Sequence, residues 1–334
     1  MIEFSHVGRR IRLESGGFHA VRVERSYHDA PASELQALTV EVEGGTPWRE
    51  AVRRRYETAN PWLTRIVTDP SRGLFFRQFP PAPGAQVLDI GAGWGQIALP
   101  LARACEVTAL EPTPERLAFI RAAAAQEAVA RKMHFLQADF FEIDFATRFD
   151  LVACIGVLEW VPAFRPGDPQ ELQLEFLRRI RGVLAPKGKV VIGIENRLGL
   201  KYLLGALDDH LGVAGIAVLP ASLAAEQWKA RSGKELRCFT YTHHELRQML
   251  AAAGLPNVTF FAALPDYKLP EVILPLGNEV DAFFDNGGFC PESEGYSGTP
   301  LTFQSELQAH YRSLAPLKAA SALVPSFFAV ASAA

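Results

Sequence analysis

Short apolar runs alternate with longer segments of helical character from residue 85 onward. This pattern predicts strands over 85–90, 106–110, 133–137, 150–155, 189–194, 257–263 and 326–332. Helices are expected between them, near 95–104, over 114–130, from 168 to about 184 and over 242–254. Regular alternation of strand and helix is typical of an α/β fold with a doubly wound, mostly parallel sheet.

Capping signals mark the starts of three expected helices. Thr113 precedes Pro114, which suits the first helical position. Asp168-Pro169-Gln170-Glu171 and Thr242-His243-His244-Glu245 have the spacing of capping boxes, in which an N-cap side chain and an acid three residues later bond each other's backbone.

The first 84 residues have a different character. Residues 1–30 alternate apolar and polar positions around Gly16-Gly17, which predicts a β-hairpin that turns at these glycines. Leu38–Val42 is expected to be a strand, and residues 48–79 are expected to be helical and broken near Pro61 and Pro70. We therefore expect four segments: a β-rich extension (1–47), a helical lid and linker (48–84), a core (85–265), and a substrate-covering insertion with the final strand (266–334).

Composition excludes several classes of protein. The net charge of −3 provides no basic field for nucleic acid. The four cysteines form no C-x-x-C pair, so neither a disulfide framework nor a zinc site is indicated, and no metal is expected. The N-terminus lacks a leader pattern, and the apolar tail 319–334 is too short to span a bilayer, so a cytoplasmic protein without a membrane span is expected.

The candidate chemistry begins at Val87–Gly95, where an apolar run ends in Asp89 and the alternating glycines Gly91, Gly93 and Gly95 follow. Glycines here let the backbone adopt positive φ and approach a ligand closely. Glu111 ends the next apolar run, where an acid can bind the two hydroxyls of a ribose. The dinucleotide fingerprint G-x-G-x-x-G fits less well, because the third glycine comes one residue early. Trp94 could face the ligand or pack on the N-terminal helices.

The sequence D-x-G-x-G-x-G resembles motif I of the class I S-adenosylmethionine (SAM) dependent methyltransferases, which have a Rossmann-like sheet. The resemblance implies SAM as cofactor, with Asp89 and the glycine loop at its methionine part, Glu111 at the ribose, and Asp139 at the adenine amino group beside Phe140. The predicted cofactor-binding residues are Arg72, Asp89, Gly91, Ala92, Gly93, Gly95, Glu111, Pro112, Asp139, Phe140, Ile155 and Gly156.

Polar segments follow the fourth, fifth and sixth expected strands: 156–160, 195–202 with 208–210, and 265–270. Together they resemble a bacterial methyltransferase group that accompanies glycosyltransferase, surface-polysaccharide and natural-product genes, with patterns of the type Gly-Val-Leu-Glu-Tyr, Glu-Asn-Lys/Arg-x-Gly-Leu-Lys-Tyr…Glu-Asp-His and Pro-Asp-Tyr-Lys-x-Pro. Trp160 replaces the Tyr and Asp208 the Glu of that pattern, and both changes keep the chemical type. The resemblance covers about residues 65–275.

Methyl transfer to a hydroxyl needs a base, and His210 is the first candidate because imidazole titrates near neutral pH. Asp209 or Asp208 could orient it, and Glu159 is the second candidate base. Each of these residues could instead serve a structural role, such as capping a helix. The side chains expected to bind the acceptor are Trp160, Asn196, Lys201, Tyr202, Asp266, Tyr267 and Lys268.

The sequence therefore predicts a SAM-dependent O-methyltransferase of a sugar, glycan or other polar metabolite. The alternatives are a methyltransferase that esterifies a carboxylate of a peptide or natural product, a SAM-binding scaffold without turnover, and an NAD-dependent oxidoreductase. The expected partners are a small-molecule, glycan or peptide acceptor and a second copy in a homodimer, with no nucleic acid.

Overall fold

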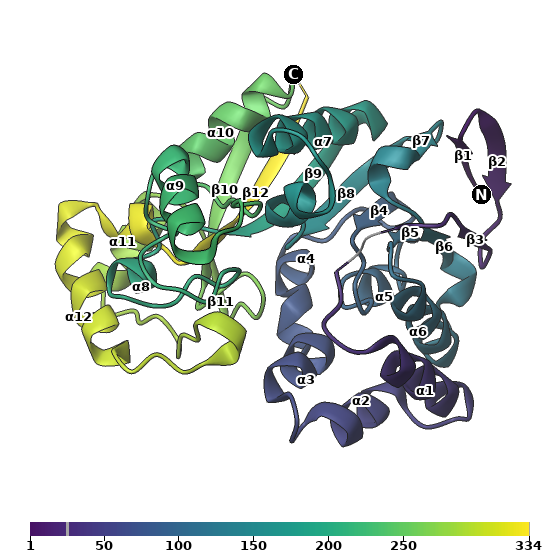
Figure 1. Cartoon of the computed structure of the whole chain (residues 1–334), viewed down its shortest axis with the longest axis horizontal. Coiled ribbons are helices and arrows are strands. Elements are labelled where there is room, and N and C mark those ends of the chain that lie inside the picture. The colour runs from purple at the N-terminus through teal and green to yellow at the C-terminus, as the bar shows by residue number, and fades with distance from the viewer. Residues whose placement is uncertain (25–26, 334) are drawn as a thin grey trace. The chain divides into compact units, whose positions relative to one another are not determined.

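The computed structural model describes residues 1–24 and 27–333, and it divides into two compact units. The first comprises residues 1–155 and 179–190, and the second comprises residues 156–178 and 191–334. The four segments expected from the sequence stay a prediction. The mixed α/β class with a mostly parallel central sheet is confirmed (Figure 1).

The sheet of the first unit contains β8 (Phe149–Ile155), β4 (Gln86–Ile90), β5 (Glu106–Leu110), β6 (Met133–Gln137) and β3 (Phe18–Ala20), in that order. Every pairing among them is parallel. Val87, Leu88 and Val107 are fully buried, as expected of parallel strands covered on both faces. The short helices α5 (Ala98–Leu101) and η2 (Ala130–Lys132) and the longer α6 (Pro114–Gln126) connect them. Pro114 does begin α6, but the Thr113 side chain does not cap it.

The N-terminal hairpin is real, but its predicted turn is wrong. β1 (Ile2–His6) pairs with β2 (Arg9–Leu13) through a turn at Val7-Gly8, and β7 (Asp144–Phe145) completes a small antiparallel sheet. Gly16-Gly17 instead leads into β3, which pairs with β6. Positions 25 and 26 of the segment predicted to alternate lie outside the described residues.

The strand predicted over Leu38–Val42 is wrong, because these residues belong to helix α1 (Ala32–Glu43). Leu35, Leu38, Thr39 and Val42 are buried at helical spacing, so one apolar face of the helix packs inward despite its β-branched residues. Figure 1 shows α1 beside α6, with which it is in contact.

The expected helical pieces follow as α2 (Trp48–Tyr56), α3 (Pro61–Thr68), the 3₁₀ helix η1 (Pro70–Gly73) and α4 (Leu74–Gln78). Pro61 and Pro70 begin α3 and η1, respectively, so the predicted breaks are confirmed.

The sheet of the second unit contains β11 (Val272–Pro275), β10 (Asn257–Leu264) and β12 (Ser326–Ser332), followed by the end of β9 (Leu184–Glu195). β10 is antiparallel to both β11 and β12. The unit also holds η4 (Leu158–Phe164), α8 (Leu200–Leu203), α9 (Ala221–Ser232) and α10 (His243–Ala252), while α7 (Pro169–Val183) runs through both residue ranges. The Thr242–Glu245 capping box is confirmed, and Asp168 caps α7 through the backbone N–H groups of Gln170 and Glu171.

The insertion before the last strand contains β11, α11 (Asn278–Asp285), α12 (Gln304–Leu314) and the 3₁₀ turns η5 (Tyr296–Gly298), η6 (Ala315–Leu317) and η7 (Ala320–Leu323). It packs into an apolar core that it shares with Leu200 of α8 and with Ala262 and Leu264 of β10. The rings of Phe284 and Tyr311 stack 4.5 Å apart in this core. Within the described ranges, no helix combines the length and apolar character needed to cross a membrane.

Candidate active site

The glycine loop after β4 has the backbone that its sequence predicts. Gly91, Gly93 and Gly95 have φ values of 67°, 58° and 83°, a region that side-chain-bearing residues rarely adopt. A Cβ on Gly95 would also lie 3.1 Å from the Leu99 side chain. The loop therefore depends on glycine for both conformation and space.

Glu111, at the end of β5, is held by the same loop. Its Oε2 accepts a 2.8 Å hydrogen bond from the Gly93 N–H, and its Oε1 accepts a 3.0 Å hydrogen bond from the Thr113 N–H. Burial raises the pKa of Glu111, and the guanidinium of Arg116, 3.9 Å away, opposes this shift. Glu111, the residue predicted to bind the ribose, is thus held in place before a cofactor binds.

Asp89, at the tip of β4, is only 2% exposed. Its Oδ2 atom has no hydrogen-bond partner among the residues that the structure describes. Burial raises the pKa of Asp89 to about 7, with Arg72 opposing the shift and Glu111 adding to it. A buried carboxylate oxygen without a partner is costly, and a ligand that carries hydrogen-bond donors or positive charge removes that cost.

Trp94 packs against protein. Its Nε1–H donates to Asp29 (3.0 Å), and its ring meets Tyr56 of α2 and Phe119 of α6 edge-on. The alternative in which Trp94 packs on the N-terminal helices is therefore the one observed.

Asp139 follows β6, and its Oδ1 accepts a 2.9 Å hydrogen bond from the Phe141 N–H at the start of η3 (Phe140–Glu142). The buried Phe140 lies beside it, and the adenine role of the pair stays a prediction. Four more predicted cofactor residues lie in this unit: Arg72 in η1, Ala92 in the glycine loop, Pro112 after Glu111 and Ile155 at the end of β8, while Gly156 begins the second unit.

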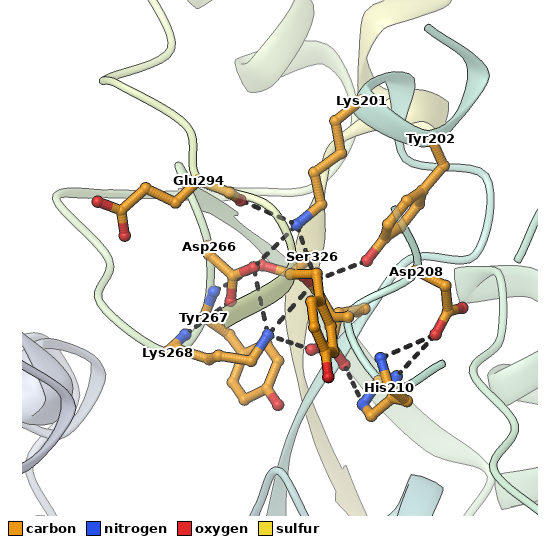
Figure 2. Close-up of polar contacts among 12 residues, drawn as sticks. Lys201, Tyr202, Asp208, His210, Asp266, Tyr267, Lys268, Glu294 and Ser326 are labelled. Carbon is orange, nitrogen blue, oxygen red and sulfur yellow. Dashed lines mark hydrogen bonds and ion pairs between the residues drawn. The ribbon is translucent and has the colours of Figure 1, made fainter. Parts of the chain in front are cut away.

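The second unit brings most of the predicted acceptor and catalytic residues together in one buried ionic network, shown in part in Figure 2. They come from η4, the end of β9, α8, the loop after α8 and the turn after β10. We call this set the polar cluster; its members are Glu159, Glu195, Lys201, Tyr202, Asp208, Asp209, His210, Asp266, Tyr267 and Lys268.

Lys201 is 1% exposed and points at the centre of the polar cluster (Figure 2). Its Nζ lies 2.8 Å from Asp209 Oδ2 and 3.4 Å from Asp266 Oδ2. The Tyr202 hydroxyl donates to the same Asp209 oxygen at 2.7 Å. Burial alone would raise the pKa of Asp209, but these partners, Lys201 first, hold it well below its usual range.

Lys268 joins the other carboxylates. Its Nζ forms a short contact with Glu195 and lies 3.6 Å from Asp209 and 3.5 Å from Asp266. Burial raises the pKa of Glu195, and Lys268 opposes that shift. Glu195 was missed as a site residue, although it ends a predicted strand in the same way as Asp89 and Glu111; that signal could have identified it.

His210 is surrounded by carboxylates. Its Nε2 lies 3.8 Å from Glu159 and 3.6 Å from Glu195, and its Nδ1 lies 3.7 Å from Asp208. Burial lowers the pKa of His210, but Cys238 and the carboxylates outweigh burial and raise the pKa well above its usual value. This shift favours the protonated imidazole, and the role of His210 as a general base stays a prediction. Asp209, with its lowered pKa, is a poor base, and Cys238 is a neighbour that the sequence did not suggest.

Tyr267 links the polar cluster to β12. Its hydroxyl donates to Glu159 Oε1 at 3.3 Å, and its backbone N–H donates to Ser326 Oγ at 2.7 Å. A Cβ on Gly156 would lie 2.9 Å from the Tyr267 hydroxyl, and Gly156 has a φ of 72°. Gly156 thus gives Tyr267 the room to reach Glu159.

The remaining two predicted acceptor residues have different surroundings. Asn196 is fully buried, and its amide donates to the backbone carbonyls of Ala322 and Val324, so the structure gives it a role in holding the chain that leads into β12. Trp160 lies edge-on to the His210 ring, 5.1 Å away.

Comparison with known proteins agrees with this geometry. Residues 88–192, which contain the glycine loop, Glu111, Asp139 and Glu159, match the family described as "Methyltransferase domain". This segment is similar to a methyltransferase domain. The match supports S-adenosylmethionine, the cofactor that the sequence predicted.

The curated relatives named here are ubiquinone biosynthesis O-methyltransferases. The chain is 31% identical to the one from Aeromonas salmonicida over 146 residues (43% of this chain, 54% of the relative). It is also 31% identical to the one from Rickettsia conorii over 123 residues (36% of this chain, 39% of the relative). The chain thus spans about half or less of the length of these relatives. Among solved structures, the CcbJ methyltransferase from Streptomyces caelestis is similar, with a TM-score of 0.47, 18% identity, and coverage of 84% of this chain and 98% of that chain.

The residues present fit SAM. Asp89 offers a buried carboxylate oxygen without a partner among the described residues, which suits an ammonium or sulfonium group. Glu111 offers a fixed carboxylate for a pair of hydroxyls. The glycine loop leaves space for close approach to its backbone.

Proposed function

We propose that this chain transfers the methyl group of SAM to an oxygen atom of a sugar or another polar metabolite. When bound, SAM supplies a methyl group that is open to in-line displacement. The first unit holds most of the predicted cofactor-binding residues, and the second unit holds the polar cluster. The similarity to O-methyltransferases supports oxygen as the acceptor atom.

The polar cluster carries the argument for a hydroxyl acceptor. Its carboxylates outnumber its basic side chains by five to three. The carboxylates are Glu159, Glu195, Asp208, Asp209 and Asp266, and the basic side chains are Lys201, Lys268 and His210. Excess negative charge disfavours a negatively charged acceptor but accepts hydrogen bonds from neutral hydroxyls. The residues that make these contacts also hold one another, so their side chains are held in place before an acceptor binds.

Loss of the hydroxyl proton needs an acceptor, and we assign that role to Glu159. It is fully buried, and its Oε2 has no hydrogen-bond partner in the described part of the chain. Tyr267 holds the other oxygen and thereby orients the carboxylate. His210, whose raised pKa favours the protonated ring, would stabilise negative charge on the acceptor oxygen.

A carboxylate acceptor is the second candidate, and one observation favours it. The pKa of His210 is raised well above its usual value, and an ionised acceptor needs no base and can pair with an imidazolium. The product would then be a methyl ester of a peptide or natural product.

The test uses SAM with a deuterated methyl group, a panel of sugars, polyols and carboxylic acids, and mass spectrometry of the products. We expect a labelled ether from a hydroxyl acceptor. Glu159→Gln should lower kcat for that acceptor by about 10²–10⁴-fold, the usual contribution of a general base, while leaving SAM affinity unchanged. Glu235→Gln, at an exposed site in the same unit, is the matched control.

A labelled ester that Glu159→Gln forms at the normal rate would support the second candidate instead. SAM binding without transfer to any acceptor of the panel would support a scaffold.

A further inference from the structure

The second unit contains a cavity of about 360 Å³, and all of its lining residues belong to that unit. Its walls come from the first turns of α7, the loop after α8, α9, the segment before α10 and α10 itself. Gln170, Glu171 and Gln248 are exposed lining residues and mark where the cavity opens to solvent, whereas Ile216 and Leu236 are buried. Sites for small organic molecules typically have volumes of about 300–1,000 Å³, so this cavity is large enough to hold one.

More than half of the described lining residues are apolar. They include the side chains of Leu174, Ile216, Leu219, Leu236, Phe239 and Met249. Such walls favour the apolar part of a ligand, because binding removes its surface and theirs from water.

Hydrogen bonds hold several of the walls in place. The Tyr241 hydroxyl donates to the fully buried side chain of Gln173, and the Gln173 amide donates to the Phe239 carbonyl at 3.2 Å. On the neighbouring wall, Arg197 donates to both carboxylate oxygens of Glu245, at 2.7 and 2.8 Å. The cavity is therefore formed before a ligand binds, which reduces the cost of ordering its walls.

The charges of the lining favour an uncharged ligand. Arg197 is the cation among the described lining residues, and its guanidinium already bonds Glu245 and the Val218 carbonyl. The other charged side chains of the described lining, Glu171 and Asp208, are carboxylates. An anionic ligand would lose its hydration without gaining an unpaired cation and would be repelled by these acids.

We propose that this cavity binds an uncharged small organic molecule with a mainly apolar body. The sequence did not suggest the site, because its walls come from segments that are far apart along the chain. The proposal does not depend on the proposed function, since binding is measured without SAM and without a methyl acceptor.

The cavity and the polar cluster share a wall. Asp208 lines the cavity, and its Oδ1 accepts a 2.8 Å hydrogen bond from the His210 backbone N–H and lies 3.7 Å from His210 Nδ1 (Figure 2). Cys238 also lines the cavity and interacts with the His210 side chain. A bound molecule would thus contact two side chains that also contact His210.

The experiment titrates the full chain with N-phenylnaphthylamine, an uncharged aromatic dye whose fluorescence rises in apolar surroundings. We expect saturable binding of one dye per chain by fluorescence and calorimetry. Anilinonaphthalene sulfonate has the same ring system plus one sulfonate group, so it is the matched anion. It should bind at least about tenfold more weakly, because it brings a charge that the lining does not pair.

Two variants locate the bound dye. Ala224→Trp and Met249→Trp place a large ring into the cavity from α9 and α10, and each should weaken dye binding by at least about tenfold. Ala230→Trp, at an exposed position of α9, is the matched control and should bind the dye as the wild type does. The Tm of each variant shows that it is folded.

If neither cavity variant folds, the wild type still decides the question through the two dyes. No saturable binding of the uncharged dye, or equal or tighter binding of the sulfonate, would overturn the proposal. Folded cavity variants that bind the dye as tightly as the wild type would also overturn it. SAM binding and methyl transfer are measured separately, so the proposed function can fail while this site stands.

Discussion

Asp89→Asn is expected to abolish SAM binding and, at the same time, to make the ligand-free chain more stable above pH 7. Asp89 is almost fully buried, with an oxygen that has no partner among the described residues. Asparagine has nearly the same shape but carries no charge that must be desolvated. We expect the dissociation constant for SAM to rise by more than about 100-fold, because a neutral amide cannot pair with a cationic ligand.

The direction of the pH dependence follows from the raised pKa. The pKa of Asp89 is about 7 in the folded chain, against 3.8 as the ordinary value. Between these values the folded chain holds a proton that the unfolded chain has lost, so the stability of the wild type falls as pH rises from about 4 to about 7 and then levels off. The full effect is on the order of 4 kcal/mol, at about 1.4 kcal/mol per pKa unit.

Thermal unfolding from pH 4 to pH 9 checks this prediction. The Tm of Asp89→Asn should exceed that of the wild type by several degrees at pH 8, and the two curves should converge toward pH 4. Asp144→Asn is a control in the same unit, because the Asp144 side chain is 77% exposed. Parallel curves over the whole range would contradict a raised pKa at Asp89.

Lys201→Met is expected to cost about 3–5 kcal/mol of stability, the usual result of removing one partner from a buried ion pair. Lys201 is 1% exposed and bonds both Asp209 and Asp266. Without it, these buried carboxylates keep only Lys268 as an ion-pair partner within the described residues. Chemical unfolding measures the loss directly.

A double variant separates charge from packing. Lys201→Met combined with Asp209→Asn removes both charges of the closest pair and keeps the hydrogen bond from Tyr202, so much of the lost stability should return. Lys234→Met, at an exposed site, should change stability by less than about 0.5 kcal/mol. If the double variant is no more stable than Lys201→Met, the loss comes from packing and not from uncompensated charge.

Most of the sheet was predictable because its strands are short apolar runs between clear turn and capping signals. The errors lie where tertiary packing outweighs local preference. The Leu38–Val42 segment has β-branched residues, yet it is helical because Leu35, Leu38 and Val42 bury one face at helical spacing. The hairpin turn was misplaced because Val7 adopts a positive φ, which is uncommon for a β-branched residue, while Gly16-Gly17 looked like the better turn.

Some features of the site could likewise be predicted from the sequence, whereas others depend on folding. Acids at strand ends identified Asp89 and Glu111, because position along a parallel strand determines where a side chain emerges. The raised pKa of His210 could not be predicted, since it depends on Cys238, Glu195 and Asp208, which are brought together only by folding. The contact of Cys238 with His210 was hidden for the same reason.

The central claim is that the loop after β4, with Asp89 and Glu111, binds SAM. Calorimetric titration of the chain with SAM and with its demethylated product, S-adenosylhomocysteine, tests it most directly. We predict saturable binding of one molecule per chain, lost in Asp89→Asn and kept in Asp144→Asn. Absence of heat and of any Tm shift with both ligands would contradict the account.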